Sequence, residues 1–213
     1  PWGQTLRLLA RPLHADLKSQ TRLLRLSLFL WAATPLVDLF LLALSGNLGT
    51  NPQETLLRST GMCCLVLLLV TLSITPLRRL LDWTELVRLR RMLGLWAFAY
   101  AFIHLLGFWA FEHEFLWSAV LKDAFKRPFV TVGLVGFALL IPLAITSNQW
   151  SMRQLGARWK TIHQLIYAVA LLGCIHFFLH RAGKNNLFDP SVALAVTVVL
   201  LGLRWRWRRP RHH

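Results

Sequence analysis

The chain of 213 residues carries a net charge of +15, is 55% hydrophobic and has a mean hydropathy of +0.49. Because this apolar content exceeds that of ordinary soluble domains and is collected in long runs, it indicates an integral membrane protein. The basic residues lie between the apolar runs and not on one patch, so the charge predicts membrane topology and no nucleic-acid partner.

Six segments are apolar enough to cross a lipid bilayer, since a spanning helix needs about 20 mostly apolar residues. They are expected at residues 24–44, 61–77, 93–111, 129–146, 162–180 and 190–205. The second, fourth and sixth are short, which predicts a compact bundle or a thin local bilayer. The fold class is therefore all-α, an integral membrane bundle of six transmembrane helices.

The connecting segments predict the orientation of the bundle. The N-terminal segment, the connections after the second and fourth spans, and the C-terminal tail are rich in arginine and lysine, whereas the other connections are nearly neutral. The loop around Arg181 and Lys184 is mildly basic although the pattern places it outside, which is a small departure from the rule. Since basic segments stay inside, both termini should be cytoplasmic. We expect a basic cytoplasmic segment at 1–22, the transmembrane domain at 23–205 and a basic cytoplasmic tail at 206–213.

Three histidines in the apolar runs can be placed by depth. The third and fifth spans are parallel, because two crossings separate them. His104 and His176 then lie in the outer halves of their spans, while His163 opens the fifth span, roughly 20 Å below His176. Imidazole nitrogens are good ligands for haem iron, and helix faces supply apolar packing for a porphyrin. The matched depth predicts that His104 and His176 are axial ligands of one haem.

Other interpretations of these histidines stay open. A histidine within a span can be a hydrogen-bonded structural residue. Zinc is less favoured, because His176 and His180 lie one turn apart but no carboxylate or thiolate is clearly placed to complete a tetrahedral set. His180, beside Arg181, is interpreted as a solvated residue at the membrane edge, with iron ligation as a weak alternative.

The remaining histidines and the cysteines receive no chemistry. The histidines outside the spans are His14, His113, His212 and His213. The cysteines have no CxxC spacing that would suggest zinc or a redox pair, and are expected to be small core residues: Cys63, Cys64 and Cys174.

The cytoplasmic ends of the third and fifth spans pose a separate question. If His163 binds a second haem, its partner is expected about thirteen or fourteen residues before His104, where Arg90 and Arg91 stand. At 100° per residue, Arg90 would lie roughly beneath His104. Arginine stays protonated and is a poor iron ligand, but its guanidinium can pair with a haem propionate or a flavin phosphate. Arg91 is interpreted as a positive-inside anchor, and Met92 as a less favoured thioether ligand.

Four ordered segments carry a resemblance to a known family over about residues 45–205. They are "SITPLRRLL", "RLRRMLGLWAFAYAFIHL", "KRPFVTVGLVGFALLIPLAITS" and "LGARWKTIHQLIYAVALLGCIHFFL". They resemble the MsrQ (YedZ) family, the haem-binding membrane subunits of bacterial methionine sulfoxide reductase systems. That family belongs to the ferric-reductase-like transmembrane superfamily.

The resemblance implies an electron-transfer subunit of the bacterial inner membrane, and not the subunit that reduces the substrate. Electrons would come from the respiratory quinone pool or a cytosolic flavin reductase, and pass to a periplasmic molybdopterin enzyme, MsrP-like, that repairs oxidised methionines. The resemblance also implies one or two haems b, with FMN reported for the family. The family's histidines fall on His104, His163 and His176. Related oxidases have a histidine where Arg90 stands, and family members often have one at the position of Arg58.

Two functions of other classes remain as alternatives. The histidines could relay protons or metal ions in a transporter, or the chain could be a membrane anchor without redox chemistry. Under the electron-transfer interpretation, we expect the acceptor to dock on the outer connections, residues 45–60 and 112–128.

Overall fold

The computed structural model describes residues 2–183 and 187–206, with side chains described from residue 19 onward, and all regular structure in these parts is helical. In chain order the elements are α1 (Trp2–Leu44), α2 (Pro52–Leu80), η1 (Thr84–Arg88), α3 (Leu89–Gly107), η2 (Phe108–Glu112), α4 (Trp117–Lys126), α5 (Pro128–Ile145), α6 (Gln149–Leu155), α7 (Ala157–Ile162), α8 (Leu165–Ala182) and α9 (Phe188–Arg206). Most of the predicted C-terminal tail lies outside the described residues.

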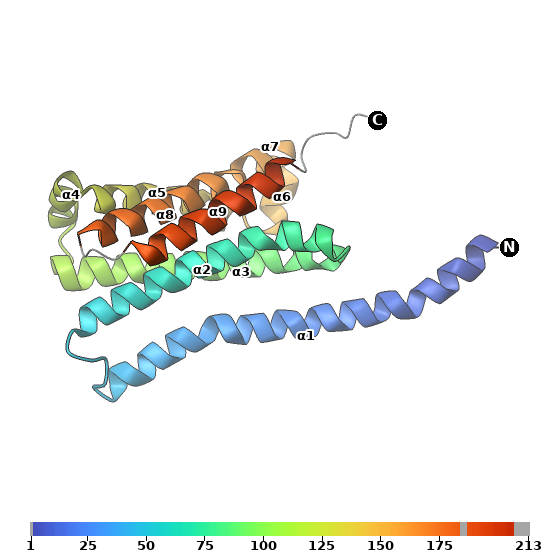
Figure 1. The fold of residues 1–213 in the computed structure, drawn as a ribbon, viewed down its shortest axis with the longest axis horizontal. Coiled ribbons are helices and arrows are strands. Elements are labelled where there is room, and N and C mark those ends of the chain that lie inside the picture. The colour runs from blue at the N-terminus through green and yellow to red at the C-terminus, as the bar shows by residue number, and fades with distance from the viewer. Residues whose placement is uncertain (1, 184–186, 207–213) are drawn as a thin grey trace.

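Six helical segments within the described residues are long and apolar enough to cross a membrane. The long helices run along one common direction, with α1 on the flank of the bundle, and α1 begins toward the end where α9 finishes (Figure 1). The predicted fold class, an all-α bundle of six spans, is confirmed. The chain is therefore a multi-pass membrane protein.

The second span is longer than predicted. Helix α2 has 29 residues and begins at Pro52, nine positions before the apolar run. The Asn51 side chain caps it by accepting a hydrogen bond of 3.2 Å from the backbone N–H of Glu54, and proline is favoured in a first helical turn. The expectation of a short second span was wrong, because a capped polar turn extends the helix beyond its apolar residues. Helices α5 and α9 are short, as predicted.

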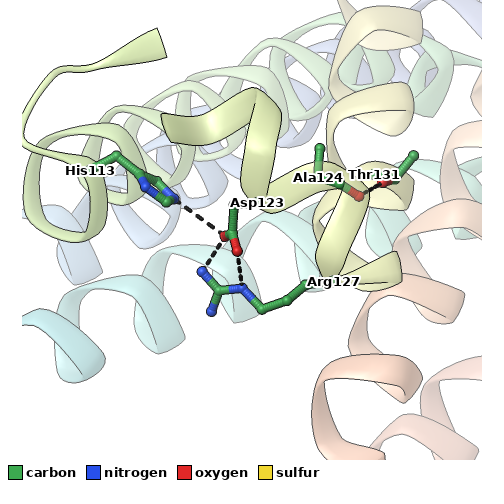
Figure 2. Close-up of polar contacts among 5 residues, drawn as sticks. All are labelled: His113, Asp123, Ala124, Arg127 and Thr131. Carbon is green, nitrogen blue, oxygen red and sulfur yellow. Dashed lines mark hydrogen bonds and ion pairs between the residues drawn. The ribbon is translucent and has the colours of Figure 1, made fainter. Parts of the chain in front are cut away.

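The connection between α3 and α5 contains the short helix α4, which the hydropathy pattern did not predict. Asp123 on α4 accepts hydrogen bonds from the guanidinium of Arg127 and lies 3.3 Å from Nε2 of His113 (Figure 2). Burial alone would raise the pKa of Asp123, but the Arg127 hydrogen bonds and charge outweigh it, so this pKa is lowered. The Thr131 hydroxyl donates to the carbonyl of Ala124. The connection between α3 and α5 is thus an ordered element, and His113 has a structural contact that the sequence did not indicate.

The core lies between α2, α3, α5 and α8, where leucines, alanines and Tyr100 are buried. Helix α1 is peripheral: only 6% of its apolar window is buried, against 44% for α2. A hydrogen bond of 2.7 Å from the Tyr100 hydroxyl to the carbonyl of Ala32 ties α1 to α3. The four central helices therefore form the interior of the bundle.

Candidate functional site

His104 on α3 and His176 on α8 face each other across the centre of the bundle. Their ring centroids are 6.1 Å apart and the ring planes are perpendicular. The prediction that the two residues reach the same depth is therefore correct. That they bind haem iron stays a prediction.

Each ring of this pair is oriented by a backbone carbonyl. Nδ1 of His104 donates to the carbonyl of Leu57 at 2.9 Å, and Nδ1 of His176 donates to the carbonyl of Phe129 at 2.7 Å. In a neutral imidazole the other nitrogen, Nε2, then carries the free lone pair. Histidines that bind metals commonly have this arrangement, because the second hydrogen bond fixes the tautomer and the ring plane.

Each ring also packs against a glycine. A Cβ atom on Gly61 would lie 3.1 Å from Cε1 of His104, and one on Gly133 would lie 2.8 Å from Nδ1 of His176. Any larger residue would therefore force the ring or the helix to move. Glycine at these two positions lets the helix backbone approach the imidazole closely.

The two half-sites repeat one local arrangement. Each histidine follows its carbonyl partner by 47 residues, and that carbonyl stands four positions before the glycine. A shift of 72 residues relates Gly61 to Gly133 and His104 to His176. Neither the two glycines nor the two carbonyls were predicted from the sequence. Comparing the second and third spans with the fourth and fifth at this shift would have found them.

The histidine pair lines a cavity of about 370 Å³ with mostly apolar walls. Two imidazoles bound to one metal ion at about 2 Å each would have ring centres about 6 Å apart, so the observed separation fits one shared iron. The apolar walls suit a porphyrin. His180 lines the same cavity, with its ring 5.4 Å from that of Phe129. Three arginines at the cavity, Arg58, Arg127 and Arg181, are suited to carboxylate groups.

His163 is engaged elsewhere and does not line this cavity. Its ring stacks on Trp159, with centroids 4.0 Å apart. The Thr146 hydroxyl donates to the carbonyl of Pro142, so it accepts a hydrogen bond of 3.0 Å from Nε2 of His163. In this tautomer the free lone pair is on Nδ1, whereas in His104 and His176 it is on Nε2.

Two arginines are partly or fully buried at the end of the bundle where His163 lies. Arg90 has a buried Nε without a hydrogen-bond partner among the described residues, and lies within electrostatic range of His163. Arg204, at the end of α9, is 6% exposed and donates to the carbonyl of Leu72 at 2.6 Å and to the hydroxyl of Tyr167 at 3.2 Å. Arg204 falls within the predicted sixth span, 190–205, and these buried contacts were not predicted from the sequence.

No second histidine pair accompanies His163 in the described part of the chain. The 72-residue shift relates His163 to Arg91, which is exposed. Within the same described residues, no three histidine, cysteine, aspartate or glutamate side chains converge as a metal-ion cluster would require. Among the described residues, His163 thus has Arg90 near it and no second histidine.

Comparison with known proteins identifies the family to which the chain belongs. Residues 59–174 match the family described as ferric reductase like transmembrane component. Among curated relatives, a protein of Bordetella pertussis (strain Tohama I) is 47% identical over 85% of this chain and 89% of its own. One of Ralstonia nicotianae is 44% identical over 89% of each chain, and one of Herminiimonas arsenicoxydans is 46% identical over 89% of this chain and 88% of its own. All three are named protein-methionine-sulfoxide reductase heme-binding subunit MsrQ. The chain therefore belongs to the MsrQ family of ferric-reductase-like transmembrane proteins.

Proposed function

We propose that this protein is a transmembrane electron-transfer subunit that binds haem b between His104 and His176. The observation that carries the proposal is the facing pair of imidazoles, 6.1 Å apart, with each Nδ1–H held by a backbone carbonyl. The names of the relatives, which specify a heme-binding subunit, support it. The electron acceptor would be a periplasmic, MsrP-like methionine sulfoxide reductase, and the location the bacterial inner membrane with both termini cytoplasmic.

Haem would supply a one-electron couple between ferric and ferrous iron. His104 and His176 would hold the iron through Nε2. The carbonyls of Leu57 and Phe129 hold the proton of each neutral ring on Nδ1 and fix the ring planes, which leaves the Nε2 lone pairs free as ligands. The apolar cavity wall excludes water and so adjusts the reduction potential. His180 is a weaker alternative ligand, one turn beyond His176.

At the inner end, we propose His163 and Arg90 as contacts of the electron-entry cofactor, either a second haem or FMN. The buried and unpartnered Nε of Arg90 supports a contact with an anionic group, because burying an unpaired charge is costly. The donor would be the quinone pool or a cytosolic flavin reductase. Only one-electron transfer is required of the chain itself.

Absorption spectroscopy of the purified protein tests the proposal. The wild type should show a reduced-minus-oxidised b-type spectrum. His104→Ala and His176→Ala should each lose most of the haem per chain, because one ligand cannot replace two. His163→Ala should retain the outer haem. His113→Ala is the matched control, since its histidine contacts Asp123 outside the cavity. A wild type without haem would refute the proposal and favour a histidine-relay transporter or a structural anchor.

A further inference from the structure

A second hollow, of about 720 Å³, lies between α1 and α3 on the outside of the bundle. It is separate from the histidine cavity and shares no residue with it. Four arginines line it, Arg22 and Arg25 from α1 and Arg88 and Arg91 from the start of the third span. Positive charges from two helices thus converge on one groove.

Most of these charges have no counter-ion among the side chains that the structure describes. Arg88 pairs with Glu85 at 2.9 Å. Arg22, Arg25 and Arg91 make no ion pair within the described residues, and all three are exposed. Like charges gathered at one place repel each other, so an anion in the groove would stabilise the arrangement.

The groove is also amphipathic along its length. On α1, apolar residues follow the arginines within one turn, and the same order recurs on α3. Phe29 of α1 and Trp96 of α3 meet edge to face, with ring centroids 5.2 Å apart, and form the apolar wall. Leu26, 56% exposed, extends this wall. The arginines form one end of the groove and the apolar side chains form the rest.

We propose that this groove binds an anionic phospholipid of the inner leaflet. Guanidinium groups bind phosphate through paired hydrogen bonds, and basic pockets between transmembrane helices hold anionic lipid head groups. The phosphate is bound by Arg22, Arg25 and Arg91, and an acyl chain lies along Phe29 and Trp96. The groove is continuous with the lipid-facing surface of α1, whose apolar side chains are largely exposed. A quinone head group carries no charge and would leave the arginines without a partner.

Lipid retention and thermal unfolding of the full chain test this site. The detergent-purified protein is mixed with phosphatidylglycerol, phosphatidylcholine or inorganic phosphate, and bound lipid is counted by native mass spectrometry. The wild type should retain phosphatidylglycerol in preference to phosphatidylcholine and unfold at a higher temperature with it. The double variant Arg22→Gln/Arg91→Gln should weaken this binding by roughly thirtyfold. Phe29→Gln should weaken it while leaving the charges in place.

The matched control is Arg153→Gln/Arg158→Gln, which removes two exposed arginines elsewhere on the same side of the protein. It should leave the lipid preference unchanged. An equal loss in this control would show a general surface-charge effect and overturn the site. Displacement of phosphatidylglycerol by inorganic phosphate would show a free-anion site and overturn the lipid assignment. If a groove variant fails to fold, the wild-type lipid preference and the phosphate competition still decide the question.

Discussion

The α2–α3 hairpin and the α5–α8 hairpin carry the same local arrangement at the end that holds His104 and His176, here called the outer end. They differ at the opposite, inner end, where His163 lies. At the outer end, both place a histidine against a glycine and bind its Nδ1–H to a carbonyl. At the inner end, the α8 hairpin has His163 packed on Trp159, whereas the related position on the α3 hairpin is the exposed Arg91. The comparison teaches that a symmetric pair of histidines can be built from one repeated local arrangement, and that the end of the bundle near His163 does not repeat it.

The largest effect is expected from replacing the glycines that pack against the two histidine rings. Gly133→Ala would place a Cβ atom 2.8 Å from Nδ1 of His176, closer than real contacts allow, so the ring or the helix backbone must move. Overpacking of this kind costs about 1–3 kcal/mol. We expect most of the haem per chain to be lost, measured by absorption and by thermal unfolding. Gly61→Ala, with a contact of 3.1 Å to His104, should lose less.

Gly202→Ala is the control for this comparison, because a Cβ atom there meets nothing within 4 Å. It should leave haem content and unfolding temperature unchanged. If Gly133→Ala binds haem as well as this control does, the glycine does not position His176, and the proposed equivalence of the two hairpins is wrong.

An intermediate effect is expected at the inner end, where a substitution should lower the stability of the protein without changing haem binding between His104 and His176. Arg204→Met removes the hydrogen bonds to Leu72 and Tyr167 and leaves the carbonyl of Leu72 without this donor. Loss of a buried partner costs about 1–3 kcal/mol. We expect a lower unfolding temperature with an unchanged outer haem spectrum in the folded protein. Arg206→Met, at an exposed position in the same turn, is the control.

The shared depth of His104 and His176 could be predicted from the sequence, and their contacts could not. Depth follows from the apolar runs and the rise per residue, quantities that a single helix determines. Whether a ring meets Gly61 or Gly133 depends on the rotation of two helices about their axes, which hydropathy does not specify. The hydrogen bonds of Arg204 could not be predicted for the same reason, since their acceptors lie on α2 and α8.

The smallest effect is expected from placing a histidine at the beginning of α3. The 72-residue shift assigns Arg91 to the position related to His163, so Arg91→His would make the two hairpins alike in sequence. Arg91 is exposed and lines the groove beside α1, whereas His163 is bonded to Thr146. The new imidazole would therefore lie away from His163, and we expect the number of haems per chain to remain that of the wild type. An additional bis-histidine haem in this variant, counted by absorption and electron paramagnetic resonance, would show that the inner ends are equivalent after all. Arg88→His, also in the groove, controls for a loss of charge there.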